Sequence, residues 1–287
     1  MLVDSIILGV LLGGFYAALS VGLTVSFGLV KIVNVAHPTF ILAASYIIFS
    51  LNSMTAADPI VIGLLLTIPF FALGVALFLA YDRLFSGRSK GDQELIGLVF
   101  FFGVLVVLEI VLLRIFGVTE RGITTSYSTS STILFGVLLP DKFLFALIAG
   151  VIMIVALHLF FTRTFTGRAV RAVAEDEIAV MLMGGRPTRV KALATGLSMA
   201  TAAVAGGLLI MVQPIYPSLD IQLVGLTFAV VILGGRRSLL GTLIASMFLG
   251  IATSVTATLL NVGLSLGVAY VILLATLALR PEGLFKR

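Results

Sequence analysis

The sequence has no cysteine and no tryptophan, only two histidines, and few charged residues for its length of 287. Without cysteine the chain can form no disulfide, no thiolate nucleophile and no metal site built on thiolates, and two histidines are too few for most metal-dependent chemistry. Charged residues make up 11% of the chain, against about 25% in soluble proteins, whereas hydrophobic residues make up 60%. So little polar surface cannot cover soluble domains of this size, and the composition therefore excludes a soluble fold.

Sequence motifs of nucleotide hydrolysis and of common hydrolases are also absent. No G-x-x-x-x-G-K-[ST] phosphate loop occurs, and the stretch GGRRS at residues 234–238 lacks both its spacing and its lysine. Neither a G-x-S-x-G elbow nor an H-E-x-x-H pair is present. We therefore expect a chain that is not an enzyme, has no catalytic or metal-binding residues, and has no ATPase site of its own.

Long apolar runs account for most of the chain. A membrane-spanning helix needs roughly 20 apolar residues. Nine runs could enter or cross a bilayer, at residues 6–30, 35–51, 59–81, 95–117, 143–161, 190–212, 223–233, 239–260 and 262–279. The runs at 35–51 and 223–233 are short and lie beside helix-breaking residues. The sequence predicts an all-α, polytopic membrane helix bundle of about seven to nine membrane segments, two of them short or broken, in a single transmembrane domain over residues 1–287.

The two predicted breaks contain the first candidate pathway residues, Asn34 and His37 in one and Gly234 and Gly235 in the other. Backbone groups freed by a break cannot face lipid, because each unpaired N–H or C=O costs several kcal/mol there. We therefore expect both breaks to be buried or to line a cavity. His37 has an alternative role as a helix-end cap that hydrogen-bonds the freed backbone.

Glu109 is the one carboxylate well inside a predicted span, in the stretch GVLVVLEIVLLRIFG. A charged acid in lipid is costly, so an intramembrane acid is by default a functional candidate, for substrate or for protons. The alternative is a structural group that faces the bundle and pairs with Arg114 or with a neighbouring hydroxyl.

The basic residues are distributed unequally between the two sides of the predicted membrane. When connections are assigned to alternate sides, fifteen of the 18 Lys and Arg residues fall on one side. Basic residues concentrate on the cytoplasmic side of membrane proteins. The bias predicts a multi-pass membrane protein with its N-terminus outside and its C-terminus in the cytoplasm.

The longest cytoplasmic connection, residues 162–189, predicts one amphipathic helix, with Ala172, Ile178, Met181 and Leu182 on or near its apolar face. Its polar side clusters Glu175, Asp176 and Glu177, and Gly184, Gly185 and Pro187 follow it as stop signals. Helices that lie on lipid favour Lys and Arg along the polar face. The three acids therefore favour docking to a partner protein over lipid binding.

Four stretches of the sequence resemble permease subunits of branched-chain amino acid ABC importers, of the LivH type. They are GLTVSFGLVKIVNVAHPTFILAASY, RAVAEDEIAVMLMGGRPTRVKALA, FAVVILGGRRSLLGTLIASMFLG and the closing LALRPEGLF. The second stretch is similar to the cytoplasmic coupling loop that docks on the ATPase, with Glu175, Asp176, Ala179 and Gly184 in the matching places. Pro38, and the pair Arg236 and Arg237, stand where the family usually has glycine, so the substrate class could extend to other amino acids, short amides or urea.

The resemblance implies a multi-pass subunit of a bacterial or archaeal cytoplasmic (inner) membrane. It implies no cofactor in this chain, since ATP would be used by partner subunits. The implied partners are a second, LivM-type permease, two ATP-binding subunits and an extracytoplasmic substrate-binding protein, with a small-molecule substrate, membrane lipid and no nucleic acid. Two rival hypotheses remain. One is a proton-coupled secondary transporter that uses Glu109, and the other is a structural membrane subunit without a pathway.

Overall fold

The computed structural model describes residues 2–85, 90–134, 137–280 and 283–284. Its elements are α1 (Leu2–Thr24), the π-helical turn η1 (Val25–Val30), α2 (His37–Thr55), α3 (Pro59–Leu65), α4 (Thr67–Phe85), α5 (Lys90–Phe116), α6 (Ser126–Thr129), β1 (Ser131–Leu134), β2 (Val137–Pro140), α7 (Asp141–Arg163), α8 (Phe165–Glu175), α9 (Glu177–Leu182), α10 (Pro187–Val212), α11 (Leu219–Gly234), α12 (Leu239–Leu259) and α13 (Val262–Leu279). Eight of the described helices are long and apolar enough to cross a membrane, and α11 is a shorter apolar helix. The predicted all-α membrane bundle is confirmed.

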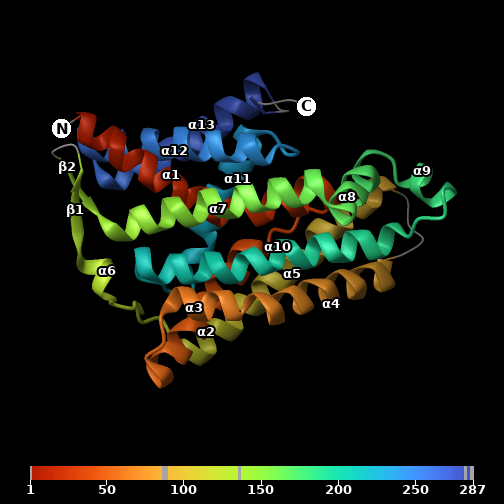
Figure 1. Cartoon of the computed structure of the whole chain (residues 1–287), viewed down its shortest axis with the longest axis horizontal. Helices are drawn as coiled ribbons and strands as arrows, with labels where there is room; N and C mark the ends of the chain where they lie inside the picture. Colours follow the sequence, from red (N-terminus) through yellow and green to blue (C-terminus); the bar gives the residue numbers. More distant parts are fainter. Residues whose placement is uncertain (1, 86–89, 135–136, 281–282, 285–287) are drawn as a thin grey trace.

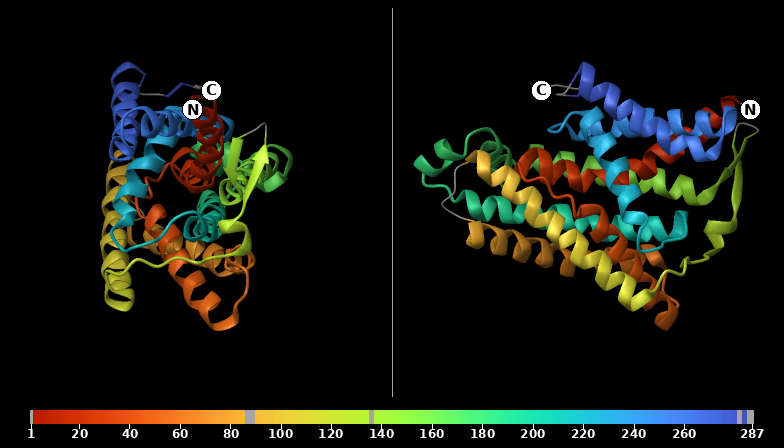
Figure 2. Two further views of the ribbon diagram at one scale, coloured as in Figure 1. Left: turned by 90° about the vertical axis from the view of Figure 1, so that its left-hand side faces the viewer. Right: turned by 180° about the vertical axis from the view of Figure 1, so that it is seen from behind.

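The long helices lie side by side along the longest axis of the molecule (Figure 1). The N-terminus, α6 and the strands β1 and β2 lie at one end, whereas α8 and α9 lie at the opposite end. Seen from behind, α11 crosses obliquely through the bundle, and α12 and α13 then run in opposite directions (Figure 2). The segment predicted to dock on a partner and the strands β1 and β2 are thus separated by the whole length of the bundle (Figure 1).

Glycines allow the central helix α1 to lie directly against its two main neighbours, α12 and α7. A Cβ atom added at Gly250 of α12 would lie 2.4 Å from the carbonyl oxygen of Gly9, and one added at Gly150 of α7 would lie 2.2 Å from that of Gly14. Packing rather than hydrophobicity drives helix association in lipid, so such close backbone contacts are the main source of specific attraction. They place α1 in the interior of the bundle.

The first predicted break lies between α1 and α2. The π-helical turn η1 ends at Val30 and is followed by Lys31, which has a φ of 61°. The chain is then non-helical until α2 begins at His37. Gly28 of η1 packs on the loop between α11 and α12, where an added Cβ would lie 1.9 Å from the carbonyl oxygen of Arg236. Asn34 and His37 are fully buried. The expectation that this break avoids lipid is therefore confirmed.

The predicted span at 59–81 differs from the structure, which divides it into α3 and α4 at Leu66. Pro69 explains the division, because proline has no N–H to donate to the carbonyl four residues earlier and its ring crowds that carbonyl. Hydrogen bonds from Leu66 to Ile62 and from Phe70 to Leu66 keep the two helices nearly continuous.

The connection at residues 119–140, predicted to lie outside, contains a two-stranded antiparallel hairpin that pairs Ser131 with Pro140 and Leu134 with Val137. Its short helix α6 is fastened to the bundle by the Tyr127 hydroxyl, which donates to the carboxylate of Asp58 at the start of α3. Burial, and then this bond to a carboxylate, raise the pKa of the Tyr127 phenol. Tyr127 therefore stays protonated and keeps its donor at neutral pH.

Candidate functional site

The connection at residues 162–189, predicted to be cytoplasmic, contains two helices, not the single amphipathic helix that the sequence predicts. The chain leaves helical geometry at Asp176, which has a φ of −144°, and its carboxylate accepts hydrogen bonds from the N–H groups of Ile178 at 2.9 Å and Ala179 at 3.1 Å. Asp176 is thus the N-cap of α9, and a capping aspartate favours a new helix start over a continued helix. Gly184, with a φ of 81°, follows the end of α9, as its predicted role as a stop signal requires.

The three clustered acids have three different structural roles. Asp176 caps α9, Glu177 forms an ion pair of 2.8 Å with Lys191 at the start of α10, and Glu175 forms one of 3.3 Å with Arg237 in the loop between α11 and α12. The segment from α8 to α9, which we call the coupling segment, is therefore attached to two separate parts of the bundle. A displacement of this segment would be transmitted to α10 and to the loop before α12.

The side chains of α8 and α9 face in different directions. Val170, Val173 and Ala174 of α8 are buried against the bundle. On α9 and just after it the apolar side chains are exposed, Leu182 at 84% and Met183 at 79%, and Ile178 and Met181 at half. Large exposed apolar side chains rimmed by charges are typical of protein interaction sites. The exposed face of α9 is therefore a candidate docking surface, and half-buried Ala179 lies on this helix.

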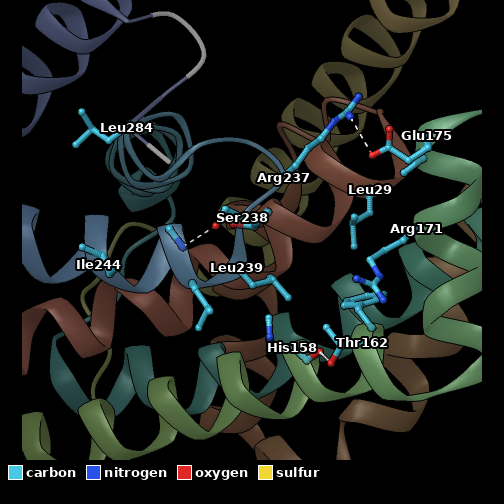
Figure 3. A pocket seen from close by; sticks show the side chains of 15 residues that line it. Leu29, His158, Thr162, Arg171, Glu175, Arg237, Ser238, Leu239, Ile244 and Leu284 are labelled. Carbon is cyan, nitrogen blue, oxygen red and sulfur yellow. Dashed lines mark hydrogen bonds and ion pairs between the residues drawn. The ribbon is translucent and has the colours of Figure 1, made fainter. Parts of the chain in front are cut away.

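A cavity of about 590 Å³ lies between the coupling segment, the end of α7, the end of α1 and the start of α12. Arg171 and Glu175 of α8 line it on one side, and Arg237 and Ser238 line it on the other (Figure 3). The ion pair between Glu175 and Arg237 crosses one edge of this cavity. One side of α8 thus packs on the bundle through Val170 and Val173, whereas Arg171 and Glu175 border the cavity.

Removal of the Asp176 cap should loosen α9. We expect Asp176→Ala to cost about 1 kcal/mol of local stability, because two backbone donors lose their acceptor. The amides of Ile178 and Ala179 should then exchange with deuterium about five-fold faster. Hydrogen exchange with mass spectrometry measures this rate, and Asp176→Asn, which keeps a capping oxygen, is the matched control. Identical exchange in the alanine variant and the wild type would contradict the cap.

A second group of polar side chains lies in the interior of the bundle, beside the break between α1 and α2. Asn34 and His37 are fully buried, and neither the Asn34 amide nor the His37 ring has a hydrogen-bond partner among the described residues. The His37 ring lies against Gly22, where an added Cβ would be 2.4 Å from its Cε1 atom and 2.3 Å from the Thr201 hydroxyl oxygen. The alternative role of His37 as a helix-end cap is therefore wrong, since a capping side chain would bond the backbone.

Asp220 belongs to the same interior region, and the sequence analysis missed it. It lies in the first turn of α11, its exposed fraction is 0%, and one of its oxygens accepts a hydrogen bond of 3.1 Å from Thr39 on α2. The predicted segment began at residue 223, which placed Asp220 outside the membrane. Five buried polar residues of this region form what we call the central polar cluster: Asn34, His37, Thr39, Thr201 and Asp220.

Glu109 of α5 is half-buried and acts electrostatically on Asp220. Its predicted pairing with Arg114 is wrong, because no ion pair joins them in the described chain. Three acidic or histidine side chains that could together hold a metal ion are not found among the described residues. The structure thus brings Glu109 to the edge of the central polar cluster, although it lies on a different helix.

Gly234 and Gly235 have a packing role in the turn between α11 and α12. A Cβ added at Gly234 would lie 2.6 Å from the carbonyl oxygen of Gly241, and Gly235 has a φ of 84°, which favours glycine. Gly283 of the closing motif packs against Gly235, whereas Pro281, Glu282 and Phe285 lie outside the described residues. The cavity beside the coupling segment is lined in this turn by Arg237 and Ser238, and by neither Gly234 nor Gly235. Their place in a pathway stays a prediction.

Comparisons with known proteins agree with this architecture. The family model described as "Branched-chain amino acid transport system / permease component" matches residues 5–277. The chain is 28% identical to the high-affinity branched-chain amino acid transport system permease protein LivH of Escherichia coli (strain K12), over 97% of this chain and 94% of that protein. It is 26% identical to the corresponding protein BraD of Pseudomonas aeruginosa, with the same coverage of both chains.

More distant relatives preserve the match over most of the chain. A probable LivH permease protein of Methanocaldococcus jannaschii is 25% identical over 93% of this chain and 87% of its own length. A chain of the solved structure of PsaBC from Streptococcus pneumoniae in complex with Fab has a similar fold, with a TM-score of 0.50 at 13% identity over 97% of this chain and 91% of that one. The family match covers nearly the whole chain, so this multi-pass membrane protein belongs to the family of branched-chain amino acid transport system permease components.

Proposed function

We propose that the chain is a permease subunit of an ABC importer in the bacterial or archaeal inner membrane, which passes branched-chain or related amino acids into the cell. It would pair with a second permease, two ATP-binding subunits and an extracytoplasmic binding protein. The family match over residues 5–277 carries this proposal. The absence of a phosphate loop from the sequence is consistent with ATP use by separate subunits.

The coupling segment is the proposed docking site of an ATP-binding subunit. Its exposed apolar face on α9 supplies the buried centre that protein interfaces need, and surrounding charges supply a polar rim. Its ion pairs with α10 and with the loop before α12 give a physical route from the ATP-binding subunit to the bundle. Movement of α9 on ATP binding would change access to the pathway through these attachments.

The central polar cluster is the proposed part of the pathway that meets the substrate. Buried polar groups nearly always have hydrogen-bond partners, so unpartnered ones call for an explanation. Asn34 and His37 have none among the described residues, and they lie at a helix break inside the bundle. Transporters commonly place their substrate at such breaks near the middle of the membrane.

Uptake by the complete importer in vesicles tests this function. The purified subunits are reconstituted with ATP enclosed on the side of the ATP-binding subunits, and binding protein loaded with labelled leucine is added on the other side. We expect leucine to accumulate only with hydrolysable ATP, and a proton uncoupler to leave accumulation unchanged. Accumulation driven by a pH gradient without ATP would support the proton-coupled rival and overturn the proposal.

The proposed orientation is tested by single cysteines, because the native chain has none. Thr188 begins α10 beside the coupling segment, and Ser128 lies in α6 at the opposite end (Figure 1). We expect an impermeant thiol reagent to label Ser128→Cys in intact cells and Thr188→Cys only after the membrane is opened. Labelling of Thr188→Cys in intact cells would reverse the orientation and remove the docking role of the coupling segment.

A further inference from the structure

Asp220 is a carboxylate inside the membrane bundle with no cation beside it. Its exposed fraction is 0%, one oxygen accepts the Thr39 hydroxyl at 3.1 Å, and the other, Oδ1, has no hydrogen-bond partner among the described residues. The backbone N–H groups of Asp220 and Ile221 also act on this carboxylate, but together with the Thr39 hydroxyl they leave part of its acceptor capacity unused. Burial of such a group without a full set of donors is strongly unfavourable, so the site is incomplete as it stands.

The surroundings of Asp220 add negative charge. Glu109 on α5 is the charged group that acts on Asp220, and two carboxylates repel each other. Both ion pairs found within the described chain lie in the cytoplasmic region, so neither Glu109 nor Asp220 is neutralised by a described basic side chain. The pair of carboxylates therefore favours a proton or the cationic group of a bound molecule in the interior of the bundle.

The position of this negative site connects it to the proposed pathway. Thr39 is in the first turn of α2, two residues after His37, and α2 begins at the break that contains Asn34. The amide of Asn34 and the ring of His37 are uncharged hydrogen-bonding groups without partners, and Asp220 is the charged member of the same cluster. Asp220 thus suits a cationic group, whereas the Asn34 amide and the His37 ring suit neutral or anionic oxygen atoms.

We propose that Asp220 is the residue that binds the ammonium group of the transported amino acid, with Oδ1 as the acceptor and with Thr39 fixing the orientation of its carboxylate. This inference rests on the proposed transport function. Glu109 strengthens the negative potential without contacting the substrate. All α-amino acids have an ammonium group, whereas their side chains differ. Asp220 therefore selects α-amino acids as a class and does not distinguish leucine from valine.

The first test uses the unmodified importer and an apolar carbodiimide, which attaches to carboxyl groups that water-soluble reagents do not reach. Modification of Asp220 is followed by peptide mass spectrometry in the complex without binding protein. We expect millimolar leucine to slow the modification several-fold, and 4-methylpentanoate, which has the same side chain and carboxylate but no ammonium, to leave the rate unchanged. Equal protection by both compounds, or no effect of leucine, would overturn the proposal.

The second test compares variants in vesicle uptake of leucine. Asp220→Asn keeps the shape of the side chain but removes its charge, and loss of one partner of a buried charge pair reduces affinity by about 30-fold or more. We expect uptake to fall by at least about 30-fold while loaded binding protein still stimulates ATP hydrolysis. Asp220→Glu should restore part of the uptake, and Glu120→Gln, which changes an exposed carboxylate in the outer connection, should behave as the wild type.

The outcomes separate this inference from the proposed function. Wild-type uptake by Asp220→Asn, in an importer whose wild type transports leucine with ATP, would overturn the role of Asp220 alone. Failure of the wild type to transport any branched-chain amino acid would overturn the proposed function. If Asp220→Asn does not assemble, carbodiimide protection in the wild type still decides the question. Wild-type uptake that a proton uncoupler abolishes at constant ATP would assign the carboxylates to protons and overturn the inference.

Discussion

Replacement of Gly250 by leucine is expected to force α1 and α12 apart and to lower the melting temperature of the chain strongly. A Cβ at position 250 would lie 2.4 Å from the carbonyl oxygen of Gly9 and 2.5 Å from the backbone nitrogen of Gly13. A neighbouring side chain can rotate away, but backbone atoms move only if the whole helix moves. Overpacking typically costs about 1–3 kcal/mol, and a clash with backbone atoms should reach the upper end, about 3 kcal/mol, which is a large part of the total stability of a typical protein.

Gly267 of α13 is the matched control for Gly250. No atom lies within 4 Å of a Cβ added there, and α13 is largely exposed at the side of the bundle. We expect Gly267→Leu to change stability by no more than about 0.5 kcal/mol. The melting temperatures of the two variants, measured on the purified protein in mild detergent, should therefore differ strongly. Equal melting temperatures would contradict the close contact of α1 with α12.

The number and order of the membrane helices could be predicted from the sequence, because lipid imposes a simple requirement on each of them. A segment must be apolar over about 20 residues to cross the bilayer, and the nine predicted runs correspond to the described helices. The division at Leu66 was not predicted, although Pro69 is a visible signal for it. The oblique course of α11 was not predicted either, because it depends on packing against α1, α2 and α12, and composition gives no information on such contacts.

The sequence located the coupling segment but predicted one helix where the structure has two, α8 and α9. Hydrophobic periodicity extends across Asp176, and it therefore predicted one helix. A capping aspartate is itself a signal for a helix start, and the run of Glu175, Asp176 and Glu177 obscured it by resembling a polar helix face. The ion pairs of Glu175 with Arg237 and of Glu177 with Lys191 join residues 62 and 14 positions apart. No local pattern could have indicated the first of these.

The central polar cluster shows the same distinction between local and distant information. Asn34 and His37 were predicted because they interrupt an apolar stretch. Asp220 was not predicted, because it precedes a short apolar run and follows Pro214 and Pro217, so that it resembled a connection outside the membrane. Only the fold brings it to Thr39, which lies 181 positions earlier in the chain. A buried acid at the start of a short membrane helix deserves the same scrutiny as one in the middle of a long helix.

Leu182→Asp should disconnect the permease from the ATP-binding subunit of the proposed importer. Leu182 is 84% exposed at the end of α9, so it contributes little to the folding of this chain. A hot-spot side chain near the centre of a docking surface contributes about 2 kcal/mol or more to binding, and a buried carboxylate in its place adds a desolvation cost. We therefore expect the affinity for the ATP-binding subunit to fall by at least about 30-fold, and ATP-driven uptake to fall with it.

Leu182→Met is the matched control, because methionine keeps the apolar character and nearly the volume of leucine. Its affinity and uptake should be close to those of the wild type. Both variants should insert into the membrane in equal amounts and melt at the wild-type temperature, since an exposed position changes stability by no more than about 0.5 kcal/mol. The affinity is measured by titrating the purified ATP-binding subunit against the permease in lipid nanodiscs. Wild-type affinity in Leu182→Asp would show that the exposed face of α9 is not part of the interface, and it would contradict the proposed docking site.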